Sequence, residues 1–142
     1  MGKILCATRG GGEASFRTQD AVIELAREHG DSIVFLYVVD THFLGYTARA
    51  VRPDVVAREM EHLGEFLLLM ASERAARQGV ESSYRVKFGA LDEALKETAA
   101  EECVSLVALG RPAGDESRFQ LAGLEEMVAE ITEETGIETR II

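Results

Sequence analysis

The chain has 142 residues, 46% of them hydrophobic and 28% charged, a composition typical of a globular protein that forms its own core. Fifteen basic and 25 acidic residues give a net charge of −10, which disfavours nucleic acid and anionic membrane surfaces as partners. The longest apolar runs are too short to cross a bilayer, and the first residues do not resemble a signal peptide. We expect one domain over residues 1–142.

The first third of the chain predicts a strand, a helix and a second strand. KILCAT (3–8) is a short apolar run typical of a buried strand, and SIVFLYVV (32–39) is almost wholly apolar, as in a strand covered on both faces. A helix is expected between them, from about Phe16 to His29. Its inner face should carry Val22, Leu25 and Ala26.

A long helix is expected in the middle of the chain. Pro53 suits a first helical turn, and the pattern continues to about Gln78, where Gly79 ends it. Apolar residues spaced by three and four predict its buried face: Val56, Met60, Leu63, Leu67 and Met70.

The next three elements continue the alternation. VESSYRVKF (80–88) alternates polar and apolar residues, as in an exposed strand at the edge of a sheet. A helix follows from about Leu91 to Glu102, and VSLVALG (104–110) predicts another buried strand. The inward positions of this helix should be Leu91, Ala94, Leu95, Thr98 and Ala99.

The chain closes with a last helix and strand. Ser117 and Gln120 have the spacing of a capping box, Gly136 ends the helix, and IETRII (137–142) predicts a fifth strand. The buried stripe of this helix should be Leu121, Leu124, Val128 and Ile131.

Strands and helices that alternate in this way predict an α/β fold. Right-handed crossovers lead to a doubly wound, Rossmann-like open sheet of five parallel strands in the order 3-2-1-4-5, with helices on both faces.

The two cysteines, Cys6 and Cys103, are far apart in the sequence and form no CxxC pair. Each lies in or beside an apolar run, so we expect two buried, reduced thiols. Reduced thiols and the lack of an evident leader predict a cytoplasmic protein.

In such a sheet, ligands bind beyond the carboxyl ends of the strands where the strand order reverses. The loops after the first and fourth strands are rich in glycine, and each begins with an arginine that could attract an anion. The plain alternative is that these arginines point to water or pair with Glu13, Asp115 or Glu116. The candidate ligand-binding residues are Arg9, Gly10, Gly11, Gly12, Val39, Gly110, Arg111, Ala113 and Gly114.

Standard phosphate-binding motifs do not fit these loops. A GxGxxG pattern that uses Gly10 and Gly12 needs a glycine where Ser15 stands, and no lysine suited to a Walker loop lies between Lys3 and Lys87. Backbone amides of the three glycines could still form an anion-binding nest.

Several stretches, in this order of elements, resemble the universal stress protein family. That family has a Gly-Ser-Glu-Ala-Ser-like turn after its first strand, here GGGEAS (10–15), and a second strand ending in His-Val-Val-Asp or similar, here LYVVD (36–40). Its fourth strand leads into a glycine-rich loop, here VSLVALGRPAG (104–114). The resemblance covers nearly the whole chain and implies a homodimer, often joined through the last strand, here ETRII (138–142).

The resemblance also implies which residues would hold ATP, and this chain departs from them. ATP-binding members carry Gly, two residues, Gly, nine residues, then Gly with Ser or Thr. Gly110 matches the first position, but Ala113 replaces the second glycine, and Gly123 is followed by Leu124 rather than by a hydroxyl residue. The family's aspartate after the first strand is replaced by Arg9.

An alignment set by the last helix does not repair the motif, because Glu126 and Met127 then take the place of its final pair. Asp115, Glu116, Glu125 and Glu126 add negative charge where a triphosphate needs positive potential. The sequence is therefore similar to the branch of the family that does not bind ATP, and no cofactor is expected.

Other chemistry has little support in the sequence. His29, His42 and His62 lack metal-ligand spacing, and no GxSxG elbow is present. The leading hypothesis is a non-enzymatic, cytoplasmic stress-response or regulatory protein that acts as a homodimer and through protein partners. The alternative is a sensor that binds ATP, AMP or another anion between Arg9 and Arg111. A nucleotide-hydrolysing enzyme is a third class, but no residue stands out as its base.

Overall fold

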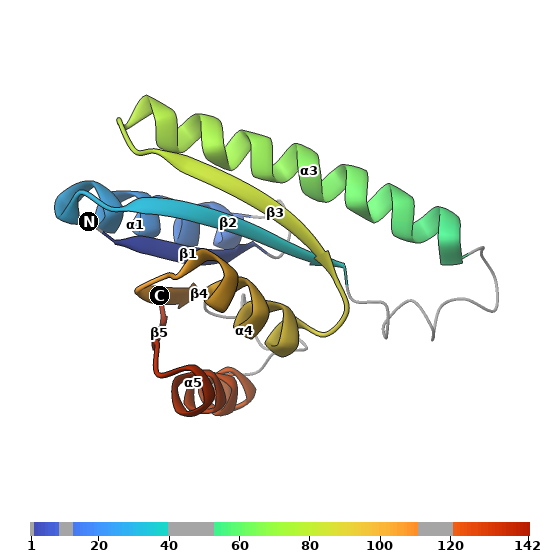
Figure 1. Cartoon of the computed structure of the whole chain (residues 1–142). Coiled ribbons are helices and arrows are strands. Elements are labelled where there is room, and N and C mark those ends of the chain that lie inside the picture. The colour runs from blue at the N-terminus through green and yellow to red at the C-terminus, as the bar shows by residue number, and fades with distance from the viewer. Residues whose placement is uncertain (1, 9–12, 40–52, 111–120) are drawn as a thin grey trace.

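The computed structural model describes residues 2–8, 13–39, 53–110 and 121–142. Helices and strands alternate along them (Figure 1). Their bounds are β1 (Lys3–Thr8), α1 (Glu13–His29), β2 (Ser32–Val39), α3 (Pro53–Arg77), β3 (Ser82–Phe88), α4 (Leu91–Glu102), β4 (Leu106–Leu109), α5 (Leu121–Thr135) and β5 (Glu138–Ile141).

The five strands form one parallel sheet in the order β3-β2-β1-β4-β5, which confirms the predicted fold class and strand order. β1 is the central strand, and its Cys6 is in register with Phe35 of β2 on one side and with Ala108 of β4 on the other. The strand order reverses between β1 and β4, as expected from right-handed crossovers.

Helices cover both faces of the sheet. α1 and α3 pack on one face, and α4 and α5 pack on the other (Figure 1). Successive residues of β1 contribute to opposite cores, so Leu5 packs with the α4 and α5 side while Cys6 packs with the α1 and α3 side. This explains why the central strands are apolar at nearly every position.

Most predicted elements match the structure, and the differences lie at element ends. α1 begins at Glu13 instead of Phe16. β3, β4 and β5 are each one or two residues shorter at their ends than predicted. The backbone of Glu81, Ser105 and Ile142, just outside these strands, still hydrogen bonds to the neighbouring strand. β3 is an exposed edge strand, as predicted. The capping box of Ser117 and Gln120 lies outside the described residues.

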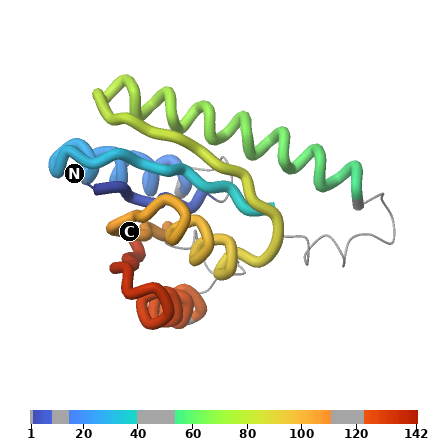
Figure 2. The backbone as a smooth tube through the Cα atoms, in the orientation of Figure 1, coloured from blue at the N-terminus to red at the C-terminus, as the bar shows by residue number. Residues whose placement is uncertain are grey.

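The predicted buried face of α3 is partly wrong. Leu67 is buried, but Leu63 and Met70 are 52% and 37% exposed. Val56 and Met60 are partly buried against the core, together with Ala57, although the first turns of α3 extend past the end of β3 (Figure 2). The fully buried face begins at Gly64 and is rotated toward small residues. It consists of Gly64, Leu67, Leu68, Ala71 and Ala75.

The prediction for the cysteines is confirmed for Cys6 and wrong for Cys103. Cys6 is fully buried, and burial raises the pKa of its thiol to about 12, so it stays protonated at neutral pH. Cys103 is exposed, because it is the C-cap of α4 in the left-handed conformation, with φ of 53°. Its apolar neighbours indicated burial, but the turn that ends the helix directs it outward.

Salt bridges attach the edge strand β3 to α4. Lys87 pairs with Glu97 at 3.0 Å and with Glu101, and Arg85 pairs with Glu102 at 2.5 Å. The hydrogen bond from Lys87 holds the pKa of the Glu101 carboxyl below its usual value. The polar side of β3 is thereby covered by helix side chains rather than by an apolar layer.

Gly64 allows α3 to approach the ring of Tyr37, so we expect Gly64→Ala to destabilise the fold. An added Cβ would lie 2.8 Å from both Cε1 and Cγ of Tyr37 and closer still to Cδ1, and this ring is only 7% exposed. Overpacking should cost about 1–3 kcal/mol of unfolding free energy in urea or heat denaturation.

Gly123→Ala is the matched control. Gly123 also lies in a helix, but an added Cβ there meets nothing within 4 Å. The gain in helix propensity should stabilise that variant by up to about 1 kcal/mol. Equal effects of the two substitutions would contradict the close packing of α3 on Tyr37.

Candidate functional site

The carboxyl ends of the parallel strands lie together at one edge of the sheet. Thr8 ends β1, Val39 ends β2 and Gly110 directly follows β4. The neighbouring positions of β1 and β4 confirm the arrangement on which the predicted crevice depends. Val39 and Gly110 are the predicted site residues that can be placed. The others lie outside the described residues: Arg9, Gly10, Gly11, Gly12, Arg111, Ala113 and Gly114.

Gly110 lies against the side chain of Thr18 in the second turn of α1. A Cβ at this glycine would be 2.6 Å from Thr18 Oγ1 and 3.3 Å from its Cγ2. The close approach of the chain after β4 to helix α1 therefore requires glycine for reasons of packing. Its presence does not need a phosphate to explain it.

Val39 is a core residue. Its side chain is fully buried, and its carbonyl oxygen accepts a hydrogen bond of 2.9 Å from the backbone N–H of Gly89, beyond β3. Its position at the end of β2 matches the prediction, but its apolar side chain belongs to the interior.

A polar chain of contacts, which the sequence analysis missed, supports the end of β1. Gln19 Nε2 donates to Thr8 Oγ1 at 3.4 Å, and Gln19 Oε1 accepts from Arg74 Nη1 at 2.9 Å. Thr8 and Gln19 are 4% and 3% exposed. This network joins β1, α1 and α3 at the carboxyl end of β1.

The outer end of this network is held by charge and by an aromatic ring. Arg74 forms a salt bridge with Asp20, and its guanidinium lies 4.9 Å from the centre of the Phe16 ring. One signal in the sequence pointed to the network: Gln19 stands three and four residues before Val22 and Ile23, on the buried face of an amphipathic helix. A polar residue buried there needs a partner.

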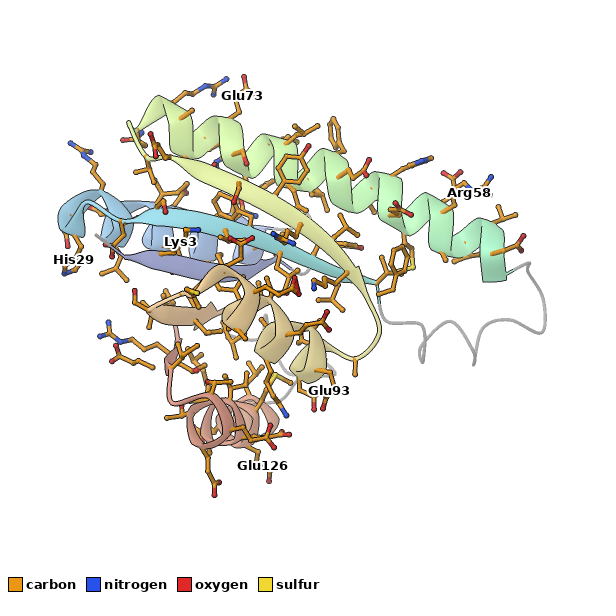
Figure 3. The ribbon with its side chains drawn as sticks, viewed as in Figure 1. Lys3, His29, Arg58, Glu73, Glu93 and Glu126 are labelled. Atoms are coloured by element: carbon orange, nitrogen blue, oxygen red, sulfur yellow. The ribbon has the colours of Figure 1, made fainter. Side chains whose placement is uncertain are left out.

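The chemistry available at this edge is that of backbone donors at the start of a helix. α1 begins at Glu13, directly after the three glycines, so its first amides face the edge where β1 and β4 end. Glu125 and Glu126 of α5 should repel a triphosphate less than the sequence predicted, because both side chains are exposed to solvent. Glu126 points away from the sheet (Figure 3).

Other kinds of site are not apparent in the part of the chain that the structure describes. No group of three His, Cys, Asp or Glu residues is arranged to hold a metal ion there, and no described helix is long and apolar enough to cross a membrane. A groove of about 530 Å³ lies at the opposite edge, near the amino ends of β1 and β2. It is lined by charges of both signs, including Lys3, Arg27, Asp31 and Glu81.

The contact between Gly110 and Thr18 can be tested with a double-mutant cycle. We expect Gly110→Ala to lower the unfolding free energy by about 1–3 kcal/mol, because its Cβ overlaps Thr18. Thr18→Ala removes the overlapping atoms, so the double variant should regain at least about 1 kcal/mol relative to additivity. Additive effects in thermal and urea denaturation would show that the two residues do not constrain each other.

Comparison with solved structures shows the same fold in other proteins. A universal stress family protein from Burkholderia pseudomallei aligns with a TM-score of 0.76 and 22% identity over 99% of this chain and 95% of that one. A universal stress protein in complex with cAMP gives 0.66 and 19%, over 99% and 96%. A family protein from Arabidopsis thaliana with AMP bound gives 0.61 and 15%, over 100% and 91%.

None of the curated protein sequences matches this chain significantly. The sequence model of the universal stress protein family, however, matches residues 1–131. That range contains β1 through β4 and most of α5, including the reversal of strand order and both glycine-rich stretches. The chain belongs to the universal stress protein family.

Proposed function

We propose that this protein is a non-enzymatic, cytoplasmic regulator of the universal stress type, which acts as a homodimer and through contacts with other proteins. The observation that carries the proposal is the edge strand β5. Among the described strands it pairs only with β4, so its other edge is available to a second copy. The family resemblance of ETRII supports the same surface.

The side chains of β5 are complementary to themselves. Glu138 and Arg140 are exposed on one face, and the buried Thr139 lies between them on the other. An antiparallel pair centred on Thr139 places Glu138 of each copy opposite Arg140 of the other. Within one copy the two side chains already form a salt bridge of 3.0 Å, which shows that they reach the same region.

The altered nucleotide motif supports a non-enzymatic role. Leu124, which stands where ATP-binding relatives have a hydroxyl residue, is fully buried in the core between α5 and the sheet. It is a packing residue and has no group to donate to a phosphate. Gly110 has a packing role of its own against Thr18. These residues favour a chain that kept the fold while its use of nucleotide changed.

The proposed dimer can be tested by reversing charge on β5. Arg140→Glu places two glutamates opposite each other at both ends of the pair. We expect the dissociation constant of the dimer to rise by roughly tenfold. Glu138→Arg combined with Arg140→Glu restores both pairs and should restore dimerisation. Sedimentation velocity at micromolar concentration measures both.

Arg27→Glu is the matched control, because it makes the same charge change on the exposed surface of α1. A wild-type protein that sediments as a monomer would reject the homodimer. A dimer that Arg140→Glu leaves intact would place the interface elsewhere.

A second candidate function is supported by the cAMP and AMP complexes of related structures. In this reading the crevice holds a nucleotide or another anion between Arg9 and Arg111. The start of α1 at Glu13, at the edge where β1 and β4 end, would supply backbone donors.

Thermal denaturation with ligands separates the two candidates. A ligand at 100 times its Kd should add about 2.7 kcal/mol to stability. We expect ATP, AMP, cAMP, phosphate and sulfate to leave the Tm unchanged, because the family motif is altered. A ligand shift that Arg9→Ala and Arg111→Ala abolish would instead favour the sensor, and a shift that both leave intact would move the site elsewhere.

A further inference from the structure

Helix α3 has a second apolar face, on the side away from the sheet. Its inner face is already occupied by the core. The outer side nevertheless carries large apolar side chains that are about half exposed. These are Val55 at 45%, Leu63 at 52%, Phe66 at 59%, Leu69 at 53% and Met70 at 37%. A soluble surface helix ordinarily has polar residues there.

Three of these apolar residues and three charged residues of α3 follow one another at a regular spacing. Glu59, Leu63, Phe66, Met70, Glu73 and Arg77 follow one another by four, three, four, three and four residues. We call these six residues the outer stripe. A repeat of 3.5 residues is the spacing with which one helix packs along another in a coiled coil.

The outer stripe is open along its length in the part of the chain that is described. No other described helix or strand lies over this side of α3 (Figures 1 and 2). Arg58 and Glu73, from opposite ends of the helix, both project away from the sheet (Figure 3). The apolar centre is therefore presented outward.

We propose that the outer stripe binds the same stripe of a second copy, with the two α3 helices antiparallel about a twofold axis. The stripe has an acidic residue near its beginning and a basic residue at its end. Antiparallel packing centred between Phe66 and Met70 sets Phe66 against Met70 of the other copy. The same register sets Glu59 against Arg77 of the other copy at both ends.

The charges favour a second copy over a lipid surface. Glu59, Glu65 and Glu73 border the apolar residues on an acidic protein, so an anionic membrane would repel this face. Arg77 already pairs with Glu73 at 3.3 Å, but both are about two-thirds exposed, and such a pair contributes little. Arg77 can therefore turn to Glu59 of the second copy at small cost.

The size of the apolar surface also fits a pair of copies. The five half-exposed side chains present on the order of 400 Å² of apolar surface. A standard interface buries about 800 Å² on each partner, a little over half of it apolar. The apolar residues of the outer stripe, together with the neighbouring Val55 and Leu69, thus supply most of the apolar part of one such interface.

This interface is separate from the one proposed on β5, because α3 packs on the opposite side of the fold (Figure 1). Two different twofold interfaces on one chain give a closed dimer of dimers when their axes intersect at right angles, and an open chain of copies otherwise. The α3 interface alone would give a dimer.

The experiment compares the mass of the full chain with that of variants in sedimentation velocity over a range of concentrations. Phe66→Asp places a charge at the centre of the stripe and should weaken the α3 association by roughly tenfold or more. Ala76→Asp adds the same charge to an exposed position of α3 outside the stripe and should have no effect. Circular dichroism spectra like that of the wild type confirm that both variants are folded.

A charge exchange tests the antiparallel register. Glu59→Arg sets two arginines against each other and should weaken association, while Glu59→Arg with Arg77→Glu should restore it. A mass unaffected by Phe66→Asp would overturn the α3 interface, and a double variant no better than Glu59→Arg would overturn the register.

The result is distinguishable from failure of the β5 dimer. If both interfaces exist, Phe66→Asp and Arg140→Glu each reduce the assembly to a dimer, and their combination gives a monomer. If Arg140→Glu has no effect while Phe66→Asp dissociates the protein, the β5 proposal fails and the α3 proposal stands.

Discussion

The strand β1 is bonded to a strand on each side and covered by helices on both faces, and the rest of the structure depends on this burial. It requires apolar side chains at almost every position, and it explains why the thiol of Cys6 is kept protonated. It also leaves the carboxyl end of β1 as the place where the interior meets the surface. There the polar Thr8 and Gln19 are buried but paired.

The same constraint separates two roles of the residues at this edge. In a family that binds nucleotides, a glycine after the fourth strand suggests contact with phosphate. Here Gly110 is needed because Thr18 approaches it, and Leu124 is needed because α5 must fill the core. Both residues have sufficient reasons in packing. Neither residue is therefore by itself a sign of a bound phosphate in this chain.

Sequence patterns predicted most of the fold because burial in a parallel sheet imposes strong periodicity. The run SIVFLYVV coincides with β2, and the positions of α4 that are fully buried were all expected. The buried face of α3 was predicted less well, because this helix has apolar residues on two sides. The spacing of these residues does not indicate which side packs on the sheet. Gly64 decides it, because only a residue without a side chain fits against the ring of Tyr37.

The candidate site was less predictable, for physical reasons that differ from residue to residue. The position of Gln19 on the buried face of α1 indicates that it needs a partner, but a local pattern does not reveal that the partners are Thr8 and Arg74, because they lie on other elements. Cys103 lies beside an apolar strand, but the left-handed turn at the end of α4 exposes it. Local chemistry predicts whether a residue suits a core, whereas the direction in which it points depends on turns and on packing between elements.

We propose that this protein acts through its outer surfaces and not through a bound nucleotide. Native mass spectrometry of the full chain, purified without added ligand, measures both the number of copies in the assembly and any bound nucleotide. We expect an assembly of an even number of copies whose mass equals that of the chains alone. A monomer that carries the additional mass of a nucleotide would contradict it.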